Sequence, residues 1–203
     1  MSSDTYTVVS TMKNEGPYIL DWVAHYKALG FDHILVCTND CTDPTVDILL
    51  RLQELGYVTQ NNTIVRKAGI HRSALRQASR RYDIVMDATW VFVCDVDEYL
   101  NVHMGDGSVR ALIEGSGKDT DVISVPWRIF GPDGVEELED TPVTEQFTKG
   151  EFEWDAKERP TTGKFVKSIY TNQEKFQRMG LHSPVSLDEH VSTTKRVLPG
   201  GAD

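Results

Sequence analysis

Two aspartates, Asp95 and Asp97, have the clearest chemical meaning in this sequence, because they directly follow an apolar run in the stretch WVFVCDVDEYL. Residues 90–94 are apolar without alternation, which is typical of a strand buried on both faces of a sheet. Side chains alternate along a strand, so the two aspartates are expected to point the same way. Neighbouring carboxylates repel each other unless a cation lies between them. We therefore expect a site for Mg²⁺ or Mn²⁺ that leaves positions open for phosphate oxygens.

A simpler explanation for these aspartates is that they are solvated or cap a following helix. A lone Asp-x-Asp at a protein surface is usually of this kind. Here the position in the chain favours ligand binding, because the carboxyl ends of parallel strands form the edge of an α/β sheet where ligands bind.

The loop MKNEGPY follows another predicted strand, residues 6–12, and belongs to the same edge of the expected sheet. Its backbone amides, Lys13 and Glu15 are candidates for contact with a nucleotide. Capping of the next helix by Asn14 or Glu15 explains the same residues equally well, and both interpretations stay open.

A run of basic residues, uninterrupted by acids, follows later in the first half. It consists of Arg66, Lys67, Arg72, Arg76, Arg80 and Arg81. Arg72, Arg76 and Arg80 are spaced by four residues and form one helical stripe, in which like charges repel weakly. Such a stripe is usually a solvated face, which is our interpretation for Arg80 and Arg81. Arg76 is the candidate for contact with the diphosphate or base of a nucleotide, and His71 is either a cap or a phosphate ligand.

The elements that must position these residues alternate between strand and helix through the first half. β-branched and apolar runs predict strands over 6–12, 33–37, 63–65 and 90–94. Prolines near helix starts and glycines after helix ends, together with periodicity, predict helices over 17–29, 44–55 and 71–82. Strands joined through helices imply a parallel sheet with right-handed crossovers. We therefore predict an α/β fold with a mostly parallel central sheet flanked by helices.

The second half of the chain shows weaker patterns. Strands are predicted over 122–130, which ends at the turn signal Gly-Pro-Asp-Gly, and over 164–170. Residues 133–163 are acidic and lack a sustained period, so we expect a long loop there. Phe130 is expected in the core, and the tail shows no obvious closing element.

Composition narrows the class of protein. The formal net charge of -10 should repel nucleic acid and anionic membranes unless the charge is strongly segregated. An odd number of cysteines without zinc spacing argues against disulfides and a zinc site, and Cys37 and Cys94 fit buried free thiols. The N-terminus lacks a signal-peptide pattern, and no apolar run is long enough for a membrane span, so we expect a cytoplasmic protein.

The chain resembles glycosyltransferases of the GT-A fold (nucleotide-diphospho-sugar transferases), and more narrowly their family 2-like branch. The resemblance is carried in order by STMKNEGPYILDWVAHYKALGFDHILVCTNDCTD, FVCDVDEYL, VPWRIFG, KFVKSIY and LHSP. It implies one GT-A-like domain over residues 1–203. Residues 1–100 would then form the nucleotide-binding half and residues 101–203 the acceptor side.

The resemblance also implies an activity, which is inverting transfer of a sugar from a nucleotide-sugar, such as a UDP-sugar, to a saccharide or other hydroxyl acceptor. Asp95 and Asp97 would hold Mn²⁺ or Mg²⁺ against the donor's diphosphate, with Asp97 as the direct ligand. His182 in LHSP matches a further metal ligand, although a surface histidine in a loop explains it too. Asp40 matches the acid that binds uracil, whereas Asp43 is better explained as a helix cap.

The catalytic base and the completeness of the chain stay open. An inverting transferase needs a carboxylate to deprotonate the acceptor hydroxyl. The sequence does not choose among Glu136, Glu137, Asp140, Glu151, Glu153 and Asp155. Because the chain also ends earlier than relatives usually do, the alternatives are a C-terminally truncated enzyme and a non-catalytic nucleotide-sugar binding module.

Two other enzyme classes fit less well. A phosphatase of the haloacid dehalogenase class also ends a strand with Asp-x-Asp, but its motif lies near the N-terminus and has Thr or Val where this chain has Tyr99. A nucleotidyltransferase with a similar sheet would carry a glycine-rich basic loop after the first strand, and this sequence has none there.

Overall fold

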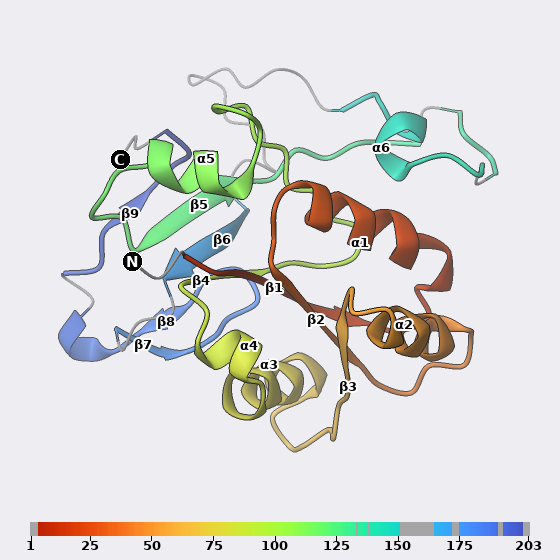
Figure 1. Cartoon of the computed structure of the whole chain (residues 1–203), viewed down its shortest axis with the longest axis horizontal. Helices are drawn as coiled ribbons and strands as arrows, with labels where there is room; N and C mark the ends of the chain where they lie inside the picture. Colours follow the sequence, from red (N-terminus) through yellow and green to blue (C-terminus); the bar gives the residue numbers. More distant parts are fainter. Residues whose placement is uncertain are drawn as a thin grey trace.

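The central sheet begins with four parallel strands, which the computed structural model arranges in the order β3-β2-β1-β4 (Figure 1). Their bounds are β1 Tyr6–Met12, β2 His33–Thr38, β3 Thr59–Asn62 and β4 Trp90–Val93. All of β4 and most of β1 and β2 are buried, as expected for apolar strands covered on both faces. The structure describes residues 4–132, 134–137, 139–150, 165–171, 175–190 and 193–200.

The second half of the chain extends the same sheet. Its strands are β5 Val122–Pro126, β6 Val166–Thr171 and β9 Arg196–Val197. β6 pairs antiparallel with both β4 and β5, and β9 pairs parallel with β5. Two short strands, β7 Phe176–Arg178 and β8 Val185–Ser186, form a separate ribbon. The predicted α/β fold with a mostly parallel sheet is confirmed, and the β4–β6 pairing joins the two halves of the chain.

Helices cover both faces of the sheet (Figure 1). One face carries η1 Gly16–Tyr18, α1 Ile19–Ala28, α2 Thr45–Glu54 and α5 Val109–Gly115. The opposite face carries α3 Ile70–Arg81 and α4 Asp83–Met86. Neighbouring residues of β1 show the division, because Val8 packs in the cluster with α1 and Val9 in the cluster with α3. The remaining helices are α6 Val143–Gln146 and η3 Asp188–His190.

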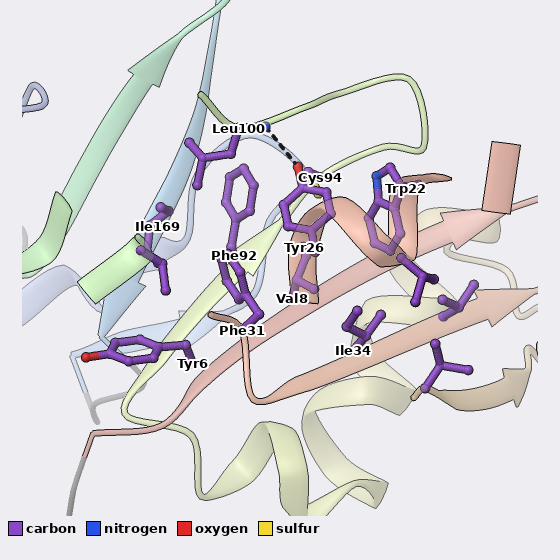
Figure 2. Close-up of a cluster of buried hydrophobic side chains, with 14 of the residues drawn as sticks. Tyr6, Val8, Trp22, Tyr26, Phe31, Ile34, Phe92, Cys94, Leu100 and Ile169 are labelled. Carbon is purple, nitrogen blue, oxygen red and sulfur yellow. Dashed lines mark hydrogen bonds between the residues drawn. The ribbon is translucent and has the colours of Figure 1, made fainter. Parts of the chain in front are cut away.

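A buried tyrosine connects the core to the segment after β4. Figure 2 shows Tyr26 of α1 among Trp22, Phe31 and Phe92. Its hydroxyl donates to the Glu98 carbonyl at 2.9 Å and accepts from the Leu100 N–H at 3.3 Å. Burial raises the pKa of the Tyr26 hydroxyl, so this group stays a neutral donor and acceptor. The core thereby fixes the backbone that carries the two aspartates.

Replacing Tyr26 with phenylalanine is expected to lower the free energy of unfolding by about 1–3 kcal/mol, because the backbone groups of Glu98 and Leu100 lose their partner. Urea denaturation measures the change. The matched control is Tyr57→Phe, since Tyr57 is 50% exposed and its change should stay within about 0.5 kcal/mol. Equal stability of the two variants would contradict this role of Tyr26.

Several sequence-based expectations about the elements were wrong. The strand expected at 63–65 lies at 59–62, where the polar residues TQNN pair with β2 in spite of their composition, while Ile64 and Val65 are exposed. β5 ends at Pro126, which lacks a backbone donor, instead of running to residue 130. Phe130 is 48% exposed and lies outside the core.

Other elements escaped prediction. Helix α5 was not expected, although Ser108 caps it by accepting a hydrogen bond from the Ala111 N–H at 3.1 Å. Helix α6 lies within the expected loop 133–163, of which residues 151–163 lie outside the described part of the chain. Strand β9 closes the edge of the sheet near the C-terminus.

The two buried cysteines agree with expectation. Cys37 and Cys94 are buried free thiols, and burial raises the pKa of both. Among the helices that the structure describes, none has the length and apolarity needed to cross a membrane.

Candidate functional site

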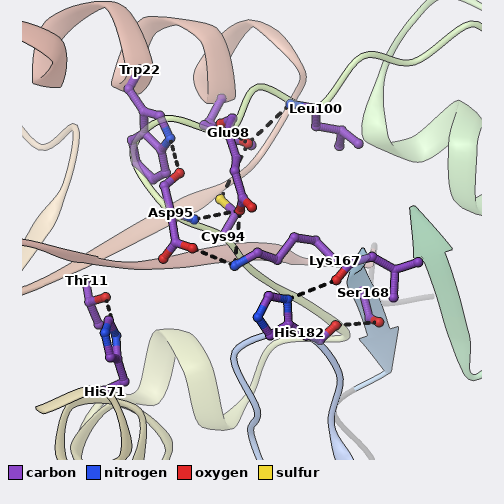
Figure 3. Close-up of polar contacts among 12 residues, drawn as sticks. Thr11, Trp22, His71, Cys94, Asp95, Glu98, Leu100, Lys167, Ser168 and His182 are labelled. Carbon is purple, nitrogen blue, oxygen red and sulfur yellow. Dashed lines mark hydrogen bonds and ion pairs between the residues drawn. The ribbon is translucent and has the colours of Figure 1, made fainter. Parts of the chain in front are cut away.

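Asp95 lies just beyond the end of β4, where a lysine from a distant strand neutralises its carboxylate. Lys167 Nζ, on β6, lies 2.7 Å from Asp95 Oδ2 and 3.2 Å from Glu98 Oε2 (Figure 3). The Lys167 side chain is only 3% exposed, and a buried ammonium needs charged partners. Lys167 was not among the predicted site residues. The available signal was a lysine within the otherwise mostly apolar strand FVKSIY.

The chain turns back directly after Asp95, so the two aspartates lie in a turn and not on an extended strand. The Glu98 N–H donates to the Asp95 carbonyl at 3.2 Å, and the Asp95 N–H donates to Glu98 Oε2 at 2.8 Å. Trp22 Nε1 of α1 also donates to the Asp95 carbonyl at 3.2 Å. Burial raises the pKa of Glu98, while the Asp95 N–H and the Lys167 charge act in the opposite direction. Core groups therefore hold this turn in place.

Asp97 occupies the exposed side of the same turn. Within the described part of the chain it forms no ion pair with a lysine or arginine, in contrast to Asp95. Glu15, in the loop after β1, has its pKa raised by burial and then by the negative charges of Asp97 and Asp43. Asp97 and the loop after β1 are therefore near neighbours, in a region of excess negative charge.

The loop after β1 is tied to the loop after β2 by side-chain hydrogen bonds. Asn14, with φ of 60°, accepts from the Thr42 N–H at 2.7 Å. The Glu15 N–H donates to Thr45 Oγ1 at 2.8 Å. Glu15 precedes η1 without a side-chain capping hydrogen bond, so the capping interpretation of these residues is not supported. Among the residues that the structure describes, the Glu15 side chain makes no capping hydrogen bond, which leaves it available for other contacts at this edge.

Asp43 has a structural position, as expected. Its Oδ1 accepts from the Thr45 N–H at the start of α2, and its Oδ2 accepts from the Gly16 N–H, both at 3.0 Å. Hydrogen bonds, first from the Thr45 side chain, lower the pKa of Asp43. This carboxylate therefore stays ionised while it joins the two loops.

Lys13 and Asp40 are exposed at the carboxyl ends of β1 and β2. Asp40 has φ of 49°, in the left-handed region that Asn and Asp adopt more readily than most residues. Its Oδ2 accepts from Asn39 Nδ2 at 3.1 Å. Both residues lie at the edge of the sheet that was predicted to hold the nucleotide, and their contact with a nucleotide stays a prediction.

Helix α3 presents the basic run. At its start, His71 Nδ1 lies 3.1 Å from Thr11 Oγ1, near the carboxyl end of β1 (Figure 3). Arg76, one turn further on, is exposed and lines a groove of about 390 Å³ along the helix. The groove is formed by α3 and the loop before it. The position of Arg76 in this groove does not test its predicted contact with the donor.

His182 lies beside the end of β6 that carries Lys167 (Figure 3). Its Nδ1 is 3.2 Å from the Val166 carbonyl, which only accepts, so in the neutral ring Nδ1 carries the proton and Nε2 keeps the lone pair. The ring packs against Trp127, with centroids 5.5 Å apart. Ser168 Oγ donates to the His182 carbonyl at 2.9 Å. The imidazole is thus oriented by its neighbours, and within the described part of the chain its Nε2 has no partner.

The predicted metal ligands do not form a closed set in this arrangement. Among the described residues, no three His, Cys, Asp or Glu side chains gather closely enough to hold a metal ion. The donors present are the exposed carboxylate of Asp97, the neighbouring Glu15 and the free Nε2 of His182. Carboxylate oxygens with one imidazole are chemically suited to Mn²⁺, and the metal stays a prediction.

The candidate bases are only partly described. Glu136, Glu137 and Asp140 are exposed on the connection between β5 and α6. Glu151, Glu153 and Asp155 lie outside the described residues. The structure therefore does not select a base.

The sequence of the chain identifies its protein family. The sequence profile of glycosyltransferase family 92 matches residues 7–199, nearly the whole length. The chain belongs to glycosyltransferase family 92. This membership confirms the predicted class of enzyme at the level of the family and disfavours the phosphatase alternative, while the family 2-like branch is not confirmed. Among the curated proteins, none matches the chain.

Solved structures that are similar to this family 92 chain share low sequence identity with it. S. aureus TarS 1-349 shares 14% identity at a TM-score of 0.49, over 83% of this chain and 47% of that chain. Glucosyl-3-phosphoglycerate synthase from Mycobacterium tuberculosis, crystallised with Mn²⁺, UDP and glucosyl-3-phosphoglycerate, shares 15% identity at a TM-score of 0.44, over 84% and 57%. The family 92 chain thus spans about half the length of these two structures.

Proposed function

We propose that this family 92 chain transfers a sugar from a UDP-sugar to a hydroxyl acceptor with the help of Mn²⁺ or Mg²⁺. The observation that carries the proposal is the contrast between the two aspartates. Asp95 is neutralised by the buried Lys167, whereas Asp97 is exposed beside the carboxyl ends of the parallel strands. An exposed carboxylate at this edge, with Glu15 beside it, suits a divalent cation and a diphosphate.

The donor atoms at this edge are of the chemical types that suit the proposed cation, although no three of them gather in the described residues. Asp97 would hold it, and Nε2 of His182 would complete its coordination from the side of β6. The bound cation would act as a Lewis acid that takes up negative charge on the departing diphosphate. The pKa of Glu15, raised by burial and by the nearby charge of Asp97, supports this location, because a cation would offset the local repulsion.

The other residues bind and orient the donor. Asp40 is proposed to accept a hydrogen bond from the uracil, and Lys13 with the neighbouring backbone amides to meet the phosphates. Lys167 pairs with Asp95 and holds its carboxylate in place, so Asp95 can accept hydrogen bonds from the hydroxyls of the donor. Arg76, predicted to contact the nucleotide, lines the groove along α3 instead, so we assign it no contact with the donor.

Transfer itself is proposed to be a single displacement. The acceptor oxygen attacks the anomeric carbon, the bond to the UDP oxygen breaks, and the proton of the acceptor moves to a carboxylate base. Attack opposite to the leaving group inverts the configuration of the sugar. The acceptor side would be formed by residues 101–203, which hold all the candidate bases.

A donor panel tests this function. Release of UDP from UDP-glucose, UDP-galactose and UDP-N-acetylglucosamine is measured with and without Mn²⁺ and a panel of saccharide acceptors, with GDP-mannose as the control donor. We expect release from one UDP-sugar that requires the cation and rises with an acceptor. Saturable binding of UDP-sugars without release under any condition would instead identify the non-catalytic binding module.

His182→Ala is expected to weaken the affinity for Mn²⁺ by about tenfold and the affinity for Mg²⁺ much less, because imidazole is a good ligand for Mn²⁺ while Mg²⁺ prefers oxygen. Calorimetric titration in the presence of UDP measures both affinities. His190→Ala is the matched control, since His190 lies in η3. Unchanged Mn²⁺ affinity in His182→Ala would show that His182 is not a ligand of the metal.

A further inference from the structure

The strongest feature outside the proposed donor site is the groove along α3. Its volume is about 390 Å³, and five of the side chains that line it are arginines, namely Arg66, Arg72, Arg76, Arg80 and Arg81. Its other lining residues include Ile64 and Ala68, so the floor is partly apolar. One wall is the exposed face of α3 and the other is the loop between β3 and that helix.

The two walls of the arginine groove are fixed to each other by buried side chains. Gln77 of α3 donates to the Ile64 carbonyl at 2.9 Å and accepts from the Ile64 N–H at 3.2 Å. Ser73 Oγ accepts from the Arg66 N–H at 2.9 Å. Gln77 and Ser73 are 8% and 4% exposed, so their side chains are largely shielded from water. The groove is therefore preorganised and does not depend on the positions of flexible surface side chains alone.

The arginines of the groove lack counter-ions in the described residues. None of them forms an ion pair with a described carboxylate, although the chain as a whole carries a net charge of -10. Arg72, Arg76 and Arg80 follow one another at a spacing of four residues, which places like charges side by side. Positive charge is thus concentrated here against the general charge of the protein, and an anionic ligand would relieve the repulsion.

We propose that this groove binds a ligand that carries two or more phosphate or sulfate groups, at a site separate from the donor site. Guanidinium groups bind such tetrahedral oxyanions in forked pairs, and several arginines in a row suit clustered anions better than a single one. The groove runs away from the donor site, because Arg80 lies about 14 Å along α3 from His71 at the helix start. Its concave shape favours an inserted ligand over a flat anionic surface.

Calorimetric titration with inositol hexakisphosphate, a soluble probe with clustered phosphates, tests this proposal. The parent protein should bind it with an affinity that falls as salt is raised. The double variant R80Q/R81Q should bind it about tenfold more weakly or not at all, since two charge-assisted contacts are lost. The matched control is R51Q/R110Q, which removes the same charge from exposed positions on α2 and α5 and should keep the parent affinity. Saturating UDP with Mn²⁺ should leave the binding unchanged.

Other outcomes would overturn the proposal. Absence of binding at low salt, or an equal loss in both double variants, would show that the groove has no specific phosphate site. Competition by UDP would make the groove part of the donor site. Vesicles of phosphatidylserine, with single separated charges, that bind as well as the probe and equally lose binding in R80Q/R81Q would indicate attraction to anionic membranes. Because the readout is binding of a probe without sugar transfer, the result is independent of the proposed transferase activity.

Discussion

Replacing Asp97 with asparagine is expected to lower kcat/KM for sugar transfer by about 10²- to 10³-fold, the range typical of losing one group that stabilises charge in a transition state. Asparagine keeps the size of the side chain but removes the negative charge that the proposed cation needs. Because Asp97 is exposed, the free energy of unfolding should change by less than about 0.5 kcal/mol. Initial rates with the donor identified from the panel, measured across Mn²⁺ concentrations, give the effect.

The control for Asp97→Asn is Asp119→Asn, which makes the same change of charge at another exposed position, in the turn before β5. It should keep the parent rate within about twofold. If Asp97→Asn also keeps the parent rate and the parent dependence on Mn²⁺, Asp97 does not hold the cation and the assignment of the site is wrong.

Lys167→Met is expected to lower the free energy of unfolding by about 3 kcal/mol, because it leaves two carboxylates at the end of β4 without their cation. The estimate is at the low end for a buried pair because the Asp95 side chain is 31% exposed, although that of Glu98 is only 17% exposed. Chemical denaturation measures the loss. Lys118→Met, at an exposed position, is the matched control and should change stability by less than about 0.5 kcal/mol.

The stability loss of Lys167→Met should depend on pH in a defined direction. Burial raises the pKa of Glu98 above its ordinary value of 4.5, so the folded protein binds this proton more tightly than the unfolded chain does. Stability contributed by that proton is therefore present at low pH and lost as the pH rises through the folded pKa. Removal of the Lys167 charge strengthens this effect. The difference in free energy of unfolding between parent and variant should be largest near neutral pH and should shrink towards pH 5. A difference that stays constant with pH would argue against ionised, unpaired carboxylates as its cause.

A second substitution separates loss of charge pairing from loss of packing. In Lys167→Met combined with Glu98→Gln, one of the unpaired carboxylates is gone, so part of the stability should return. If the double variant is as unstable as the sum of the two single variants, the loss comes from the packing of the Lys167 side chain, whose Nζ lies 6.0 Å from the centre of the Trp127 ring.

Short local patterns in the sequence are enough to predict one part of the site. The apolar run before Asp95 indicates a buried strand, and the position of a strand end in a parallel sheet indicates a ligand-binding edge. The same argument brings Lys13 and Asp40 to that edge, because each follows its own parallel strand. The structure places all three residues there.

The rest depends on pairings between distant segments. Lys167 contacts Asp95 only because β6 pairs antiparallel with β4. No local sequence pattern indicates which strand pairs with β4. β3 is an edge strand of polar residues that pairs with β2. It therefore lacks the apolar run by which a strand is usually predicted. The spacing of the arginines alone favours an ordinary solvated face. The stripe becomes one wall of a groove because the buried Gln77 holds the loop before α3 against the helix, and no local sequence pattern indicates this contact.

The most direct test of the proposed donor site is calorimetric titration of UDP into the parent protein with and without Mn²⁺. With the cation absent, the diphosphate would face Asp95, Asp97 and Glu15, of which only Asp95 is paired with a lysine in the described structure. We predict that Mn²⁺ strengthens UDP binding by at least about tenfold and that this gain disappears in Asp97→Asn. Equal affinity for UDP with and without Mn²⁺ would contradict a cation-assisted donor site at Asp97.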